Sequence, residues 1–172
     1  KRGDIGNTAK QYAYSIFDHF GFDCVTINPF MGPDSVVPFL EKKEKGVFLL
    51  AKTSNASSSY FQDFRGGNIF LYEKVAKMAR DLNQNNNVGL VVGATASNEL
   101  KIIRAVSSGM PILIPGVGAQ GGNLNSCMKI GNKNGISLIN ISRGISFAGD
   151  MSSRSIEIAA SNFLNKMHDS LK

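Results

Sequence analysis

The sequence contains no tryptophan, only two cysteines and no long apolar run, and each shortage excludes a class of protein. Cys24 and Cys127 lie far apart, without CxxC spacing or a nearby pair of histidines, which argues against a zinc site and against a disulfide scaffold. No apolar run approaches the roughly 20 residues of a membrane span, and the N-terminus lacks the charged-then-apolar pattern of a signal peptide. These features predict a soluble protein in a reducing, cytoplasmic compartment.

Acidic residues are fewer than lysines and arginines, and the formal net charge is +6. The lysines and arginines are spread along the chain, and no stripe of interleaved basic and aromatic residues occurs. This distribution favours a solvated basic surface over a nucleic-acid interface. A phosphate ligand remains compatible with the charge but does not follow from it.

The 172 residues, 42% of them hydrophobic, can bury one sizeable core, which predicts a single domain over residues 1–172. Short apolar, β-branched runs alternate with longer amphipathic stretches, as in repeated βα units around a parallel sheet. Strands are predicted for residues 24–28, 47–51, 88–93, 111–114 and 137–141.

The amphipathic stretches predict helices for residues 7–20, 34–43, 69–82, 98–108, 123–131 and 151–167. Segments 53–68 and 83–87 carry Ser, Asn and Gly without a period and are predicted loops, the first long enough to cover an active site. Side-chain caps are expected from Asn7 or Thr8, Asp34 or Ser35, and Ser97 or Asn98.

The strict succession of βα units is compatible with two folds, a doubly wound sheet and an incomplete barrel. Polar residues and glycines follow directly after every predicted strand, as in the stretches 28–29, 53–54, 93–95, 115–120 and 142–144. Such residues at the carboxyl ends of successive strands describe a site at one face of a barrel. Residues 1–8 read as a strand end that turns into a helix, so a barrel would need about two and a half more units before Lys1.

Six ordered motifs resemble the orotidine 5'-phosphate decarboxylase family and together cover essentially the whole chain. KRGDIGNTA, from Lys1 to Ala9, resembles the family's DxKxxDIGNT segment without its leading aspartate. The later motifs are VTINPFMG, LLAKTSN, VGLVVGAT, IPGVGAQGG and INISRGI, in the family's order and spacing. Six ordered matches are far more specific than one short fragment.

The resemblance implies a TIM (β/α)8 barrel whose first two to three strands are missing from this chain. It also implies decarboxylation of orotidine 5'-monophosphate to UMP in pyrimidine biosynthesis, without a cofactor or metal. The family's homodimer, which shares its active sites between subunits, is the expected assembly, with no nucleic-acid or membrane partner.

The resemblance also assigns roles at the start of the chain. Lys1 resembles the lysine that protonates C6 of the pyrimidine as CO2 leaves, so it is the expected general acid. Asp4 resembles the aspartate that the dimer contributes to the neighbouring active site, and Ile5 and Thr8 are expected to reach into the partner's pocket. Without the motif, Lys1 is an ordinary terminal lysine and Asp4 a helix-start carboxylate.

Further expected substrate contacts follow strand ends. Thr53 and Ser54 match the position that reads the pyrimidine edge, and Pro115 would line the base pocket. Gln120 resembles the glutamine whose amide links pyrimidine and phosphate. Ser142 and Arg143 resemble the phosphate site, where a planar guanidinium can pair with phosphate oxygens.

The chain departs from the family because an aspartate and a lysine of the first two units, and the aspartate two residues before Lys1, are absent. The isolated chain is therefore expected to be almost or entirely inactive unless another chain supplies this segment. Two alternatives stay open: a related sugar-phosphate decarboxylase or aldolase that uses magnesium, and a non-catalytic nucleotide-phosphate-binding module.

Overall fold

A five-stranded parallel sheet forms the centre of the computed structural model, which describes residues 2–118 and 120–172. The strands lie in the order β1-β2-β5-β6-β7, and every neighbouring pair is parallel. Their bounds are Cys24–Ile27 (β1), Gly46–Lys52 (β2), Val88–Val92 (β5), Ile112–Pro115 (β6) and Ser137–Asn140 (β7). All five predicted strands are confirmed, with no end displaced by more than one residue.

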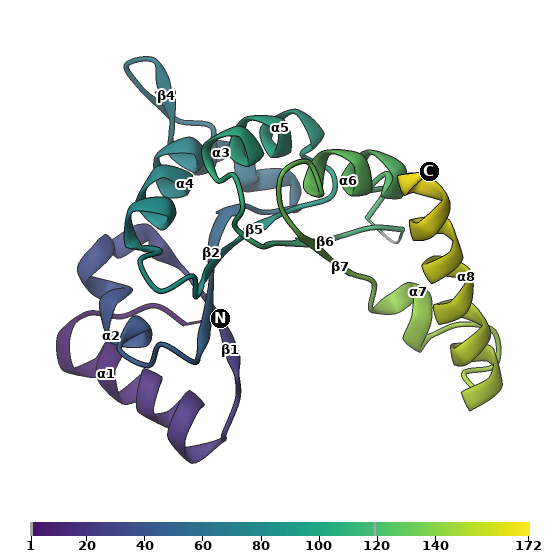
Figure 1. The fold of residues 1–172 in the computed structure, drawn as a ribbon, viewed down its shortest axis with the longest axis horizontal. Coiled ribbons are helices and arrows are strands. Elements are labelled where there is room, and N and C mark those ends of the chain that lie inside the picture. The colour runs from purple at the N-terminus through teal and green to yellow at the C-terminus, as the bar shows by residue number, and fades with distance from the viewer. Residues whose placement is uncertain (1, 119) are drawn as a thin grey trace.

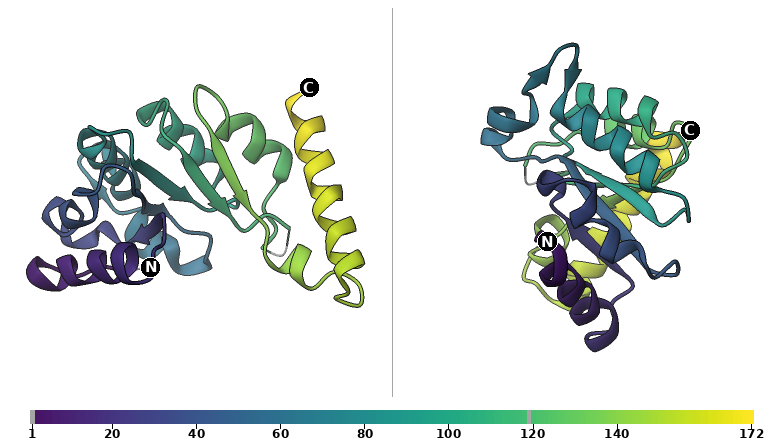
Figure 2. Two further views of the ribbon diagram at one scale, coloured as in Figure 1. Left: turned by 60° about the horizontal axis from the view of Figure 1, so that its bottom comes forward. Right: turned by 90° about the vertical axis from the view of Figure 1, so that its left-hand side faces the viewer.

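Helices cover the convex side of the curved sheet, and the long last helix lies beside the β7 edge (Figures 1 and 2). The α-helices are Gly6–Tyr14 (α1), Val37–Leu40 (α2), Ser59–Gln62 (α3), Leu71–Leu82 (α4), Ser97–Val106 (α5), Leu124–Gly131 (α6), Arg143–Ser146 (α7) and Ser153–Leu171 (α8). A π-helical segment, Ser15–His19, extends α1, and 3-10 turns span Pro29–Met31, Pro33–Ser35 and Ala56–Ser58. A small antiparallel pair, β3 (Arg65–Gly66) and β4 (Ile69–Phe70), projects from the body in Figure 1.

Three predicted segments differ from the structure. The helix predicted for 34–43 is broken into a 3-10 turn and the short α2, because Pro38 has no N–H and is accepted only in a first turn. The predicted loop 53–68 instead contains α3 and β3. Residues 69–70, predicted as a helix start, form β4, so α4 begins at Leu71.

The predicted side-chain caps are wrong. The N-cap residues of α1, α2 and α5 are Ile5, Val36 and Ala96, and none of them makes a side-chain capping bond. Both α1 and α5 begin early enough to include their predicted caps in the first helical turn. Side-chain caps occur instead at Asn123, which accepts from the Ser126 N–H, and at Ser152, which accepts from the Ser155 N–H.

The two faces of the sheet differ in burial. On the helix-covered face, Leu49, Leu90 and Ile112 lie in register across three strands, and each is 0% exposed. Burying such a side chain contributes roughly 1.5–3 kcal/mol, so this face is the core. One residue further along, Leu50 and Leu113 point to the concave face and are only half-buried. The concave face therefore has room for a cavity.

Arg2 extends the sheet beyond β1. Its N–H donates to the Thr26 carbonyl at 3.1 Å, and its own carbonyl accepts from the Asn28 N–H at 2.7 Å. This parallel pairing confirms that a strand end precedes α1. Among the described residues, no helix is long and apolar enough to cross a membrane.

Candidate active site

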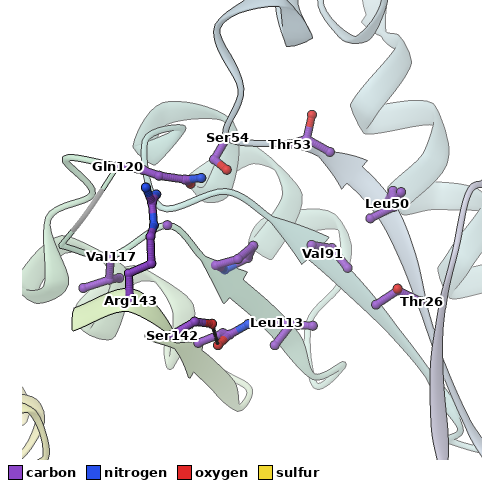
Figure 3. A pocket seen from close by; sticks show the side chains of 13 residues that line it. Thr26, Leu50, Thr53, Ser54, Val91, Leu113, Val117, Gln120, Ser142 and Arg143 are labelled. Carbon is purple, nitrogen blue, oxygen red and sulfur yellow. Dashed lines mark hydrogen bonds between the residues drawn. The ribbon is translucent and has the colours of Figure 1, made fainter. Parts of the chain in front are cut away.

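A cavity of about 380 Å³ opens at the carboxyl ends of the five strands. Every strand contributes to it, β6 with both Leu113 and Pro115, and the segments after β2, β6 and β7 contribute the rest (Figure 3). The strand residues that line only the floor are Thr26, Leu50, Val91, Leu113 and Asn140. Its volume lies in the range of small-molecule sites, roughly 300–1,000 Å³.

Six predicted substrate-binding residues meet in this cavity although they come from three separate strand ends. They are Thr53, Ser54, Pro115, Gln120, Ser142 and Arg143. The five floor residues were not predicted. Alternate residues of a strand face the same side of the sheet, and this period of two could have identified them. However, strands buried on both faces read as continuous apolar runs, so the sequence does not reveal which residues face the cavity and which face the helices.

A bulge in β2 turns the residues after it. The register shifts between Leu50 and Lys52, and Leu50 and Thr53, three residues apart, both line the cavity. Lys52 is consequently directed away from the cavity. It is 4% exposed, and its Nζ lies 2.6 Å from the Asp63 carboxylate, just after α3.

Gln62 holds Thr53 in place beside this ion pair. The Thr53 N–H donates to Gln62 Oε1 at 2.9 Å, and Gln62 Nε2 donates to Thr53 Oγ1 at 2.9 Å. Together, the Lys52–Asp63 and Thr53–Gln62 pairs fasten the segment after β2 to the strand end; we call these four residues the β2 latch. The latch fixes the backbone from which Ser54 enters the cavity.

Two glycines allow the chains around Ser54 and Gln120 to approach closely. A Cβ on Gly93 would lie 2.7 Å from the Ser54 backbone, closer than such atoms occur. Gly116 has a φ of +100°, and a Cβ there would collide with the Gln120 amide oxygen and lie 3.3 Å from Ser54 Cβ. Side chains at these positions would therefore displace both predicted ligand contacts.

Arg143 supplies the charge of the cavity. Among the described lining residues it is the only ionisable one. Figure 3 shows its guanidinium extending toward the Gln120 amide, while the Ser142 hydroxyl donates to Asn140 Oδ1 at 3.2 Å. A single exposed cation among hydroxyl and amide groups favours an anionic ligand group at this end.

Of the predicted residues at the chain start, the three that the structure describes do not line this cavity. Lys1 lies outside the described residues. Asp4, Ile5 and Thr8 are not among the lining residues, and Ile5 is 58% exposed. The Asp4 carboxylate accepts from the Ile5 N–H at 2.8 Å. Among the described residues, no group of three or more His, Cys, Asp or Glu side chains is arranged to hold a metal ion.

Parallel βα units with a polar cavity at the strand carboxyl ends define an α/β protein of the TIM-barrel type, with five of the eight barrel strands among the described residues. A family model described as "Orotidine 5'-phosphate decarboxylase / HUMPS family" matches residues 1–156. The chain belongs to this family, as its motifs predicted.

Curated proteins of this family are similar to the chain in sequence. The orotidine 5'-phosphate decarboxylase of Natronomonas pharaonis is 49% identical over 152 residues, covering 87% of this chain and 56% of the relative. That of Dehalococcoides mccartyi strain 195 is 49% identical over 154 residues, covering 86% of this chain and 57% of the relative. The chain thus spans about half the length of the curated relatives it matches.

Solved structures give the same fold. The Leishmania donovani OMP decarboxylase matches with a TM-score of 0.89 and 39% identity, covering 99% of this chain and 66% of that one. An orotidine 5'-monophosphate decarboxylase from Methanocaldococcus jannaschii, complexed with the inhibitor BMP, matches with a TM-score of 0.74 and 25% identity, covering 97% and 70%. The predicted TIM-barrel fold is confirmed.

Proposed function

We propose that the whole protein decarboxylates orotidine 5'-monophosphate to UMP in pyrimidine biosynthesis, without a cofactor. The observation that carries this proposal is the meeting of Ser54, Gln120 and Arg143 in one cavity at the strand ends. Membership of the family and the names of the curated relatives support it.

The phosphate of the nucleotide would bind at Arg143. A guanidinium can donate two parallel hydrogen bonds to phosphate oxygens, and the absence of a carboxylate among the described lining residues leaves it available. The Gln120 amide, on the Arg143 side of Ser54 in Figure 3, can donate to the phosphate and accept from the base. Phosphate binding far from the reacting carbon can then help organise the base pocket.

The pyrimidine would lie over the apolar floor. Leu50, Val91 and Leu113 offer apolar side chains to the ring, and Thr53 and Ser54 offer hydroxyl and backbone groups to its polar edge. The β2 latch holds that edge-reading segment in place before the ligand arrives, which lowers the ordering cost of binding.

Lys1 and Asp4 would act on the reacting carbon. Loss of CO2 leaves a carbanion at C6 with little resonance stabilisation, so an ammonium beside C6 both stabilises the charge and supplies the proton. We assign that ammonium to Lys1. The Asp4 carboxylate would favour the protonated lysine and contact the ribose.

A dimer would explain why Asp4, Ile5 and Thr8 lie outside the cavity of their own chain. Near them, Phe30, Tyr60, Phe61 and Phe64 form an exposed aromatic patch in which Phe30 and Phe61 have ring centroids 6.4 Å apart. Gly3, directly before Asp4, packs against Met31, which links the start of α1 to this patch. We infer that a second copy covers the patch and receives Ile5 and Thr8 in its cavity.

A cytoplasmic location fits this activity. Cys24 and Cys127 are both free thiols, as a reducing compartment maintains them. Cell fractionation with an antibody to the protein tests this location.

Loss of orotidine monophosphate absorbance measures the proposed activity in the whole protein, with and without EDTA. Turnover that persists in EDTA and is abolished by Lys1→Ala is expected. Activity on sugar phosphates that EDTA removes would point to the magnesium-dependent relatives instead. Tight UMP binding without turnover would leave a nucleotide-binding module.

A further inference from the structure

A second cavity, of about 550 Å³, lies between α5 and α6. Its lining residues are Lys101, Arg104, Ala105, Ser108, Lys129, Ile130, Lys133 and Asn134. Arg104 donates to the carbonyls of Met110 and Ile136, which lie two residues before β6 and one residue before β7. This α5–α6 cleft therefore lies at the amino ends of the strands, whereas the candidate active site lies at their carboxyl ends.

The cleft is lined by cations alone among ionisable groups. Lys101, Lys129 and Lys133 join Arg104, and no aspartate or glutamate is among the described lining residues. Within the described part of the chain, none of the three ammonium groups forms a hydrogen bond or an ion pair. Their mutual repulsion has no compensating negative side chain in the cleft.

Arg104 is a buried cation without a carboxylate. It is 3% exposed, and burial lowers the pKa of its guanidinium. Its terminal nitrogens donate to four carbonyls, those of Ser107, Met110, Gly131 and Ile136. Its Nε has no partner among the described residues.

A purely structural role accounts for part of this arrangement. The Ser107 and Gly131 carbonyls belong to the C-terminal ends of α5 and α6, where cations are favourable. That role explains the terminal nitrogens of Arg104. It leaves unexplained its unpaired Nε and the three unpaired lysines around a hollow.

Both walls of the cleft are flanked by further described elements. Helix α4 packs against α5, and α8 packs against α6 (Figure 2). The cleft is thus a solvent-open groove between two helices within the helical layer, and it does not lie at the open edge of the sheet.

We propose that the α5–α6 cleft binds a small polyphosphate anion, separately from the candidate active site. Lysine ammonium groups from two helices can each donate to phosphate oxygens, and the Ser108 hydroxyl and Asn134 amide add neutral donors. Because the cations come from both walls, an anion with two or more linked phosphates can reach them together. Pyrophosphate is the simplest probe of this class.

Isothermal titration of the whole protein with pyrophosphate, at constant ionic strength, tests the proposal. Saturable binding should persist in Arg143→Ala, which removes the cation of the other cavity. The pair Lys129→Met and Lys133→Met should weaken it at least about tenfold. Lys74→Met, an exposed and unpaired lysine of α4, is the matched control and should leave it unchanged.

The contrary results are equally distinct. Absence of saturable binding in Arg143→Ala would place any pyrophosphate in the candidate active site and overturn the proposal. Equal weakening by Lys74→Met would reduce the effect to general surface charge and overturn it too. Arg104 stays unchanged in every variant because its four carbonyl contacts support folding. Failure of the decarboxylase proposal would not affect these outcomes.

Discussion

Arg143 and Arg104 occupy opposite ends of the same sheet and serve different purposes. Arg143 follows β7 at the carboxyl ends of the strands, is exposed and faces a cavity of about 380 Å³. Arg104 lies at the amino ends, is 3% exposed and donates to four backbone carbonyls. A guanidinium surrounded by carbonyls stabilises the fold, whereas one left in solvent among hydroxyls is available to a ligand.

The first prediction removes the available arginine. Arg143→Ala should lower kcat/KM for orotidine monophosphate by about a thousandfold, roughly 4 kcal/mol, because a charged hydrogen-bonding partner of the phosphate is lost. The thermal midpoint should hardly change. Steady-state kinetics and a thermal melt on the same sample check both halves, and an unchanged kcat/KM would remove Arg143 from the site.

The second prediction removes the structural arginine. Arg104→Met should lower the free energy of unfolding by roughly 3 kcal/mol, because buried carbonyls lose their donors. KM should stay within about twofold, since the residue lies at the other end of the sheet. Urea unfolding measures the loss, with Arg80→Met on the exposed face of α4 as control. Equal stability of the two variants would contradict the comparison.

A third cation, Lys52, combines both situations, since it is buried like Arg104 yet adjoins the cavity like Arg143. Asp63→Asn leaves Lys52 buried without its counterion and should cost about 2 kcal/mol of stability. Lys52→Met leaves Asp63, whose side chain is 34% exposed and remains solvated, so about 1 kcal/mol is expected. Both should raise KM more than they lower kcat. The reverse order of stabilities in urea would refute the latch.

The smallest expected effect concerns an exposed carboxylate. Hydrogen bonds from Ser155 and Ser152 lower the pKa of Asp150 from 3.8 to about 2. Because the folded pKa lies below the unfolded one, the stabilisation is complete above pH 3.8 and is lost as the pH falls toward 2. Asp150→Asn should therefore lower the thermal midpoint at pH 6 and make no difference near pH 2. A constant difference between these pH values would contradict the assignment.

The sequence was most informative where residue type and local geometry agree. The five strands could be predicted from their β-branched runs, and the family resemblance selected the six cavity residues from the polar and glycine residues at the strand ends. The caps could not, because Ser97 and Asn98 have capping chemistry but fall inside the first turn of α5. The roles of the Lys1–Thr8 segment stay predictions.

Arg104 and the β2 latch lay beyond prediction for a different reason. Arg104 finds carbonyls 27 and 32 residues away, and the Thr53–Gln62 pair spans a segment that reads only as a polar loop. Such partners are chosen by tertiary packing, which no local pattern encodes. The floor residues of the cavity were hidden for the related reason that both sheet faces are apolar.

The bulge in β2 decides which of the side chains directly after it face the cavity. At an unchanged chain length, regular alternation would turn Lys52 inward and Thr53 outward, since successive strand residues face opposite sides. The register shift after Leu50 therefore decides that a hydroxyl, and not an ammonium, lines the cavity wall, although the order of side chains in the sequence is the same in both cases. In this stretch, the local backbone register is itself a determinant of ligand chemistry.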